Sequence, residues 1–107
     1  MTVIHVDRAS DWFSVEAEGH ANAKRNDDGR DLVCCAISTL MCTLANSCAQ
    51  LEGPAVVYHT LDGFARLTVS NVRSCPDGLR ARLQMLLDGL HVLEQQYPQN
   101  VRLKIHD

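Results

Sequence analysis

The chain has 107 residues, of which 46% are hydrophobic, and a formal net charge of −3 at pH 7. This size and apolar content predict one globular domain over residues 1–107 with an ordinary core, and they argue against disorder. The slightly acidic balance argues against a dedicated nucleic-acid binder, which usually presents a strongly basic face.

The cysteines and the first residues of the chain indicate its compartment. The five cysteines are an odd number, and the first residues, MTVIHVDRASDW, have no basic flank and no long apolar run. These features favour free thiols in a reducing cytoplasm over a disulfide framework or secretion. No stretch approaches the ~20 apolar residues that a membrane-spanning helix needs. We therefore expect a cytoplasmic protein without a membrane segment.

Two strands and one helix are predicted in the first half of the chain. The β-branched run of residues 2–7 and the alternation in residues 12–18 predict a hairpin. A polar, turn-rich segment follows over residues 21–30, and a helix is expected from about residue 31 to about residue 51. The apolar residues expected to form its core stripe recur at steps of three and four: Val33, Ile37, Leu40, Leu44 and Cys48.

The second half predicts a second hairpin, a second helix and a final strand. Their expected ranges are residues 56–60, 64–70, 76–97 and 101–105. The pair Asp62-Gly63 is a strong hairpin signal. Pro76 suits the first turn of the second helix, with Ser74 or Cys75 as its cap. The order β-β-α-β-β-α-β predicts an α/β fold, a two-layer sandwich in which two helices pack on one mixed sheet.

A histidine and a cysteine lie at the two ends of the polar segment. Cys34 is expected in the first turns of the helix, where unpaired N–H groups and the helix dipole favour a thiolate. His20 ends the preceding strand, and an imidazole beside the thiol can hold its proton. The same N–H groups suit an oxyanion formed by attack on a carbonyl. The pattern suggests a nucleophilic cysteine, although most helical cysteines are plain core residues.

The neighbours of Cys34 have competing interpretations. Helical spacing puts Asp31 and Ser38 on the same face as Cys34, while Cys35 turns about 100° away. Asp31 is expected chiefly as a helix cap, with orientation of His20 as the alternative, and Ser38 equally suits a bond to the helix backbone. The cysteines and histidines lack the paired spacing of zinc ligands, so no metal site is expected.

The sequence around these residues resembles the ribosomal-processing cysteine protease Prp family of bacteria. The family pattern is Gly-His-Ala, a polar loop, then Gly-x-Asp-Ile-Val-Cys-Ala-Ala-hydrophobic-Ser. The corresponding residues are Gly19-His20-Ala21 and Gly29-Arg30-Asp31-Leu32-Val33-Cys34-Cys35-Ala36-Ile37-Ser38. The ending LLDGLHVLEQQYPQNVRLKI is similar to the family's second helix and last strand. Two departures are a slightly longer loop after Ala21 and a cysteine at position 35, where the family often has alanine.

The resemblance implies a cysteine endopeptidase that removes the N-terminal extension of a large-subunit ribosomal protein, the twenty-seventh by standard naming. It implies an α/β sandwich that is usually a homodimer, with His20 and Cys34 as the catalytic pair and no cofactor. Gly19, Asp31 and Ser38 match supporting positions. The expected substrate loop includes Ala21, Asn22, Asp28 and Gly29. The implied partners are the ribosomal extension and a second copy, without direct nucleic-acid or membrane binding.

Two other functions remain open from the residues alone. One is a non-catalytic module that binds a ribosomal protein through an exposed sheet edge. The other is a thiol redox sensor that pairs Cys34 with another thiol. Adjacent cysteines form a disulfide only with strain, which counts against a Cys34–Cys35 pair. A thiol that reacts well below pH 8, and only when His20 is present, would favour the protease.

Overall fold

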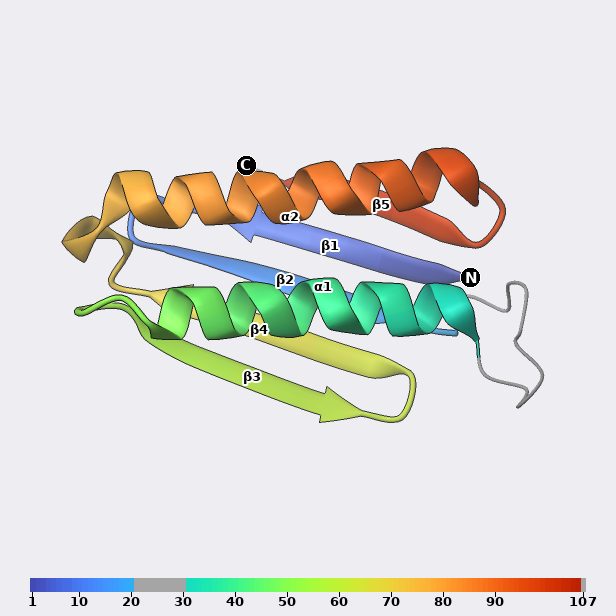
Figure 1. The fold of residues 1–107 in the computed structure, drawn as a ribbon, viewed down its shortest axis with the longest axis horizontal. Helices are drawn as coiled ribbons and strands as arrows, with labels where there is room; N and C mark the ends of the chain where they lie inside the picture. The colour runs from blue at the N-terminus through green and yellow to red at the C-terminus, as the bar shows by residue number, and fades with distance from the viewer. Residues whose placement is uncertain (21–30, 107) are drawn as a thin grey trace.

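The computed structural model describes residues 1–20 and 31–106 and shows one five-stranded sheet with two helices on the same face (Figure 1). The elements in chain order are β1 (Thr2–Arg8), β2 (Trp12–Glu18), α1 (Leu32–Ala49), β3 (Ala55–Leu61), β4 (Phe64–Ser70), the short 3-10 turn η1 (Val72–Ser74), α2 (Pro76–Gln96) and β5 (Val101–His106). The predicted order and the two-layer α/β sandwich are confirmed, and η1 is an addition that the sequence patterns did not predict.

The sheet brings three distant parts of the chain to one end of the molecule. Its strand order is β3-β4-β2-β1-β5, and all neighbours are antiparallel except β1 and β5. Glu18 at the end of β2 pairs with Phe64 at the start of β4, and Phe64 also pairs with Leu61 at the end of β3. The turn between β3 and β4 therefore lies beside the end of β2, and α1 starts at this same end (Figure 1).

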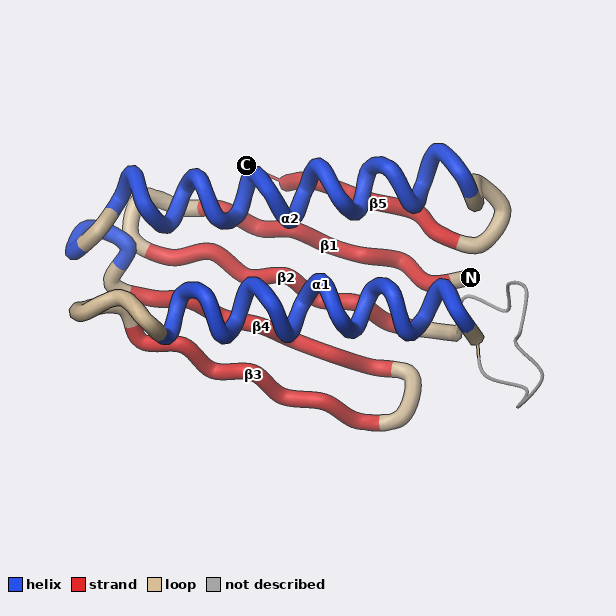
Figure 2. Tube along the Cα trace, in the orientation of Figure 1, coloured by secondary structure: helices blue, strands red, loops and turns tan. Residues whose placement is uncertain are grey.

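Both helices lie over one face of the sheet (Figure 2), and the core lies between the helices and that face. Alternate strand residues such as Ile4, Val15 and Leu67 are fully buried, as the two-residue period of a strand requires. The buried stripe of α1 consists of Val33, Ile37, Met41, Leu44, Ala45 and Cys48.

Leu40 packs against the core as expected but only at its edge, and Met41, which was not expected in the α1 stripe, is the fully buried residue there. Leu40 is only half-buried, and it is turned toward α2. A β-carbon added at Gly89 of α2 would lie 3.2 Å from Leu40 Cδ2. The steps from Ile37 to Met41 to Leu44 keep the stripe over the sheet, and Leu40 fills the space between the two helices instead.

The two helices begin differently. Asp31 is the N-cap of α1, and its side chain accepts backbone hydrogen bonds from the first turn. Cys75 occupies the N-cap position of α2 as one of the two expected residues, but its side chain makes no capping bond. Pro76 starts α2, where its missing N–H costs nothing because the first N–H groups of a helix have no partner within it.

The composition of α1 is unusually apolar. None of its 18 residues is charged, and their mean hydropathy is 1.7, so length and composition alone would allow this helix to cross a membrane. That is closer to a membrane-spanning helix than the sequence patterns led us to expect. In this fold the helix packs its buried stripe against the sheet.

Candidate active site

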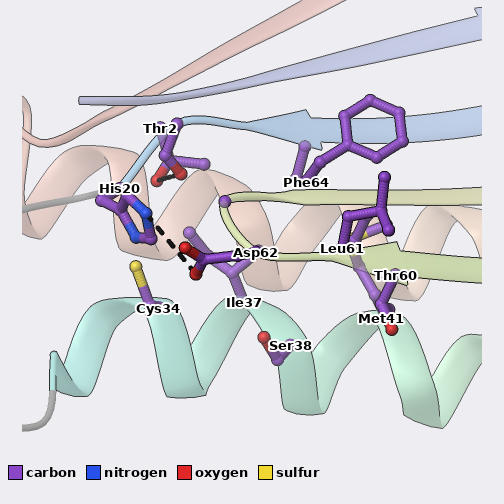
Figure 3. Close-up of a pocket in the computed structure, with 14 residues that line it drawn as sticks. Thr2, His20, Cys34, Ile37, Ser38, Met41, Thr60, Leu61, Asp62 and Phe64 are labelled. Atoms are coloured by element: carbon purple, nitrogen blue, oxygen red, sulfur yellow. Dashed lines mark hydrogen bonds and ion pairs between the residues drawn. The ribbon is translucent and has the colours of Figure 1, made fainter.

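A cavity of about 250 Å³ lies between the start of α1 and the turn that joins β3 to β4 (Figure 3). Its apolar lining includes Ile37, Met41, Leu61 and Phe64, and its polar lining includes Thr2, His20, Cys34, Ser38, Thr60 and Asp62. Four residues that the sequence singled out, Gly19, His20, Cys34 and Ser38, therefore line one cavity. Gly19 and His20 follow β2, and Cys34 and Ser38 lie in the first turns of α1, so the end of one strand and the start of one helix meet at this cavity.

Cys34 lies in the first turn of α1 and is half-buried. Its thiol points from the helix into the cavity, toward the ring of His20 (Figure 3). The neighbouring Cys35 is exposed and does not line the cavity, as the rotation of one helical residue requires. The two adjacent cysteines thus occupy different environments.

Asp31 serves as the helix cap, which was the first of its two expected roles. Its Oδ1 accepts hydrogen bonds from the N–H groups of Val33 and Cys34, at 3.0 and 3.1 Å, and the residue is only 8% exposed. The Cys35 N–H donates to the Asp31 carbonyl at 3.1 Å. These bonds fix the first turn and so the direction of Cys34.

These hydrogen bonds contradict the expectation that the first N–H groups of α1 bind an oxyanion. A carboxylate at the N-cap is a strong acceptor at hydrogen-bond distance, and it engages the Val33 and Cys34 donors before any substrate arrives. The negative charge of the cap is in turn balanced by these donors and by the helix dipole.

Gly19 sets the direction in which the chain leaves β2 and thereby places His20. Its φ is +90°, and a β-carbon at this position would overlap the carbonyl oxygen of Met1, so only glycine fits without a shift. The Gly19 N–H donates to the Gly63 carbonyl at 2.8 Å, and Thr2 Oγ1 donates to the Gly19 carbonyl at 3.1 Å. The backbone just before His20 is therefore held from both sides.

His20 has a carboxylate neighbour that the sequence patterns did not indicate as a site residue. Its Nε2 lies 3.8 Å from Asp62 Oδ1, with the His20 side chain 55% exposed and that of Asp62 97% exposed. Asp62 was recognised only as part of the Asp62-Gly63 turn. The turn lies next to His20 because β2 pairs with β4. No local signal in the sequence specifies that pairing.

The remaining predicted residues are placed as follows. Ser38 lines the cavity one turn after Cys34 and is exposed. The substrate-loop residues Ala21, Asn22, Asp28 and Gly29 lie outside the described residues. Within residues 1–20 and 31–106, no group of three or more His, Cys, Asp or Glu side chains is arranged to hold a metal ion.

The arrangement suits acyl transfer. A thiol that faces an imidazole can pass its proton to the ring and attack a carbonyl carbon. The cavity is open to solvent on one side and lined by apolar residues on another, so it can admit a peptide and then water. The assignment of His20 and Cys34 as a catalytic pair stays a prediction.

Comparison with known proteins identifies the family. Residues 1–102 match the family model of the cysteine protease Prp. The crystal structure of the essential ribosomal processing protease Prp from S. aureus with a covalently linked product peptide has a TM-score of 0.78 and 22% identity, and the match covers 99% of this chain and 100% of that chain. The S. aureus structure with a substrate peptide gives 0.74 and 21%, with the same coverage.

A third solved structure, SMU.848 from Streptococcus mutans, has a TM-score of 0.73 and 27% identity, over 98% of this chain and 93% of that chain. Among curated proteins the search finds no match. The family match extends over nearly the whole chain and includes both the cavity and the residues around it. This chain belongs to the cysteine protease Prp family and is a cysteine protease.

Proposed function

We propose that this chain removes the N-terminal extension of a bacterial large-subunit ribosomal protein, the twenty-seventh by standard naming, during ribosome assembly. Cys34 is the nucleophile, and His20 is the general base and then the general acid. One observation carries the proposal: the thiol of Cys34 lines the same open cavity as the imidazole of His20 and points toward its ring (Figure 3). Family membership and the fold shared with a ribosomal processing protease solved with peptides support it.

The first half of the reaction forms a thioester. The Cys34 proton moves to the His20 imidazole, which leaves a thiolate and an imidazolium. The thiolate attacks the carbonyl carbon of the scissile bond, a C–S bond forms, and the π electrons move to the oxygen. The dipole of α1 favours the thiolate, while the Asp31 carboxylate at the helix cap opposes it, so the His20 imidazolium is the main charge that stabilises it. The Val33 and Cys34 N–H groups already donate to Asp31, so we do not assign them as donors to the oxyanion.

The second half frees the product. The imidazolium gives its proton to the departing amine nitrogen as the C–N bond breaks, and the acyl group stays on sulfur. Water then attacks the thioester while His20 takes one of its protons. The C–S bond breaks, the proton on His20 returns to the Cys34 sulfur, and the product leaves as a carboxylic acid whose remaining proton, also from the water, passes to solvent.

We further propose that the enzyme is a cytoplasmic homodimer whose substrate partner is the extension-bearing ribosomal protein. The sheet buries one face under the helices, and a chain of this size gains stability from a second copy. Analytical ultracentrifugation of the purified chain measures its oligomeric state directly. A mass of two chains is expected, and a mass of one chain at micromolar concentration would contradict the dimer.

The test of function is cleavage of a synthetic peptide that carries the extension and the first residues of the mature ribosomal protein. Mass spectrometry of the products should show one cut with the wild type. Cys34→Ala and His20→Ala should bind the peptide, by fluorescence anisotropy, and leave it uncut.

Cys35→Ala is the matched control, because it removes the adjacent thiol, which lies outside the cavity, and should cut normally. Full cleavage by Cys34→Ala would reject the assignment. A thiol that is consumed by peroxide in a protein that never cuts the peptide would favour the redox sensor.

A further inference from the structure

The His20 ring rests on the turn between β3 and β4. A β-carbon added at Gly63 would lie 3.1 Å from His20 Nε2, 3.5 Å from Cδ2 and 3.6 Å from Cε1. Three atoms of one ring at such similar distances mean that the imidazole lies against the place where a side chain would begin. Gly63 has φ +70°, so glycine is favoured here by the backbone as well as by the ring.

This contact is part of a continuous backbone connection. The Gly19 N–H donates to the Gly63 carbonyl at 2.8 Å, one step beyond the last pair of the β2–β4 ladder, Glu18 with Phe64. The residue before His20 and the residue beneath its ring are therefore bonded to each other. The turn and the residue that leads into His20 are thus joined directly.

The same turn supplies the carboxylate nearest to the ring. Asp62 Oδ1 lies 3.8 Å from His20 Nε2 (Figure 3). Asp31 accepts from Val33 and Cys34 at the start of α1, where its carboxylate is the cap of that helix. Among the described residues, the titratable side chains that line the cavity are His20, Cys34 and Asp62.

On the assumption that His20 is the base of the proposed protease, we propose that the Asp62-Gly63 turn is its positioning element. Gly63 gives the ring a flat surface that fixes its plane. Asp62 favours the proton on Nε2, which leaves Nδ1 as the nitrogen that accepts the Cys34 proton. The thiol proton then forms the Nδ1–H bond, the imidazolium keeps its Nε2–H, and Asp62 remains ionised throughout.

The contribution of Asp62 is electrostatic and exposed, so it is modest and sensitive to salt. Asp62→Asn keeps a good turn residue and removes the charge. At low salt we expect kcat/KM for the peptide, and the rate of Cys34 alkylation at pH 7, to fall by about threefold to fivefold. The loss should lie in kcat with KM unchanged. At 1 M salt, where the screening length is about 3 Å, the variant and the wild type should converge.

Asp88→Asn is the matched control, because it removes the same charge from an exposed site on α2, where Asp88 accepts a bond from Gln84. It should behave as the wild type at both salt concentrations. A structural role for Asp62 would lower thermal stability and give a loss of activity that salt does not remove, and that result would overturn the electrostatic part of the proposal.

Gly63→Asn tests the surface beneath the ring. Asparagine tolerates positive φ better than other residues, so the turn is kept while a β-carbon meets the imidazole. We expect roughly a tenfold or greater fall in kcat/KM and in Cys34 alkylation, since a displacement of about 1 Å can cost 10²-fold. The midpoint of thermal unfolding reports whether the hairpin survives.

The His20→Ala background separates this inference from the proposed function. If the turn acts through the ring, Asp62→Asn and Gly63→Asn should cause no further change in Cys34 alkylation once His20 is absent. If both turn variants match the wild type while His20→Ala is inactive, the positioning role fails and the catalytic pair stands. If His20→Ala itself cuts and labels normally, the proposed function fails.

Discussion

The two ends of α1 carry the same side chain in opposite settings. Cys34, near the start, lines an open cavity and points toward an imidazole. Cys48, near the end, has no exposed surface, and burial raises the pKa of its thiol while the Arg82 guanidinium lowers it by less. The two residues are 14 positions apart, which places them within about 40° of the same side of the helix.

The difference between the two cysteines comes from what the sheet offers beneath each of them. Beneath Cys48 lies the main core, which includes Val72 and Leu79. Beneath Cys34 the strands stop, and the Asp62-Gly63 turn and His20 border a cavity instead. The surroundings of the two cysteines therefore differ because of their positions along the sheet, although the residue type is the same.

The largest expected effect is the loss of activity on substitution of Cys34, which lines the cavity. Cys34→Ala should lower kcat/KM for the extension peptide by roughly 10⁴-fold or more, because the nucleophile is lost and the other groups act only through it. The free energy of unfolding, from urea titration, should change by less than about 1 kcal/mol because the site is half-buried. Appreciable residual cleavage would mean that another group attacks the substrate.

Gly19→Ala should affect both activity and stability. The positive φ and the overlap with the Met1 carbonyl should cost about 1–3 kcal/mol of unfolding free energy. Because the residue leads directly into His20, kcat/KM should also fall. Gly89→Ala is the control, since its β-carbon would meet only the flexible Leu40 side chain, and it should keep full activity. Equal activity of the two variants would contradict the role given to Gly19.

A smaller effect, on the free energy of unfolding alone, is expected for substitution of the buried Cys48 near the end of α1. Cys48→Ser places a hydroxyl in the core and should lower the free energy of unfolding by about 1–3 kcal/mol, with kcat/KM unchanged below the unfolding temperature. The folded-state pKa of Cys48 lies above its ordinary value of 9.0. Its contribution to stability is therefore complete below that pH and decreases as the pH rises toward the folded-state value.

The serine variant should show a flatter fall in thermal stability above pH 9.0, because it lacks this thiol. Melting curves of both proteins between neutral and alkaline pH measure the difference. A slope that is the same in the two proteins would show that Cys48 ionises as readily when folded as when unfolded.

The parts of the fold that depend on local chemistry follow from the sequence. Turn residues such as Asp62-Gly63, the helix start at Pro76 and the cap at Asp31 are all specified within a few residues of where they act. The choice between Leu40 and Met41 in the α1 stripe is different. It depends on how the helix is rotated over the sheet and against Gly89, which the sequence period does not determine.

The candidate site divides in the same way. His20 and Cys34 are found from their motif, but their shared cavity depends on the strand order that sets β2 beside β4. Asp62 is missed because its approach to His20 arises from that long-range pairing. A pairing of strands about 50 residues apart leaves no periodic trace in the sequence around either of them.

The most direct test of the central claim is peptide-resolved alkylation of the native protein with iodoacetamide at pH 7, compared between the wild type and His20→Ala. Cys35 and Cys42 are exposed on the same helix and provide internal standards. Cys34 should label fastest in the wild type although it is less exposed than they are, Cys48 should stay unlabelled, and His20→Ala should bring Cys34 down to the rate of Cys35. A Cys34 that labels no faster than Cys35, or whose rate does not depend on His20, would contradict the account.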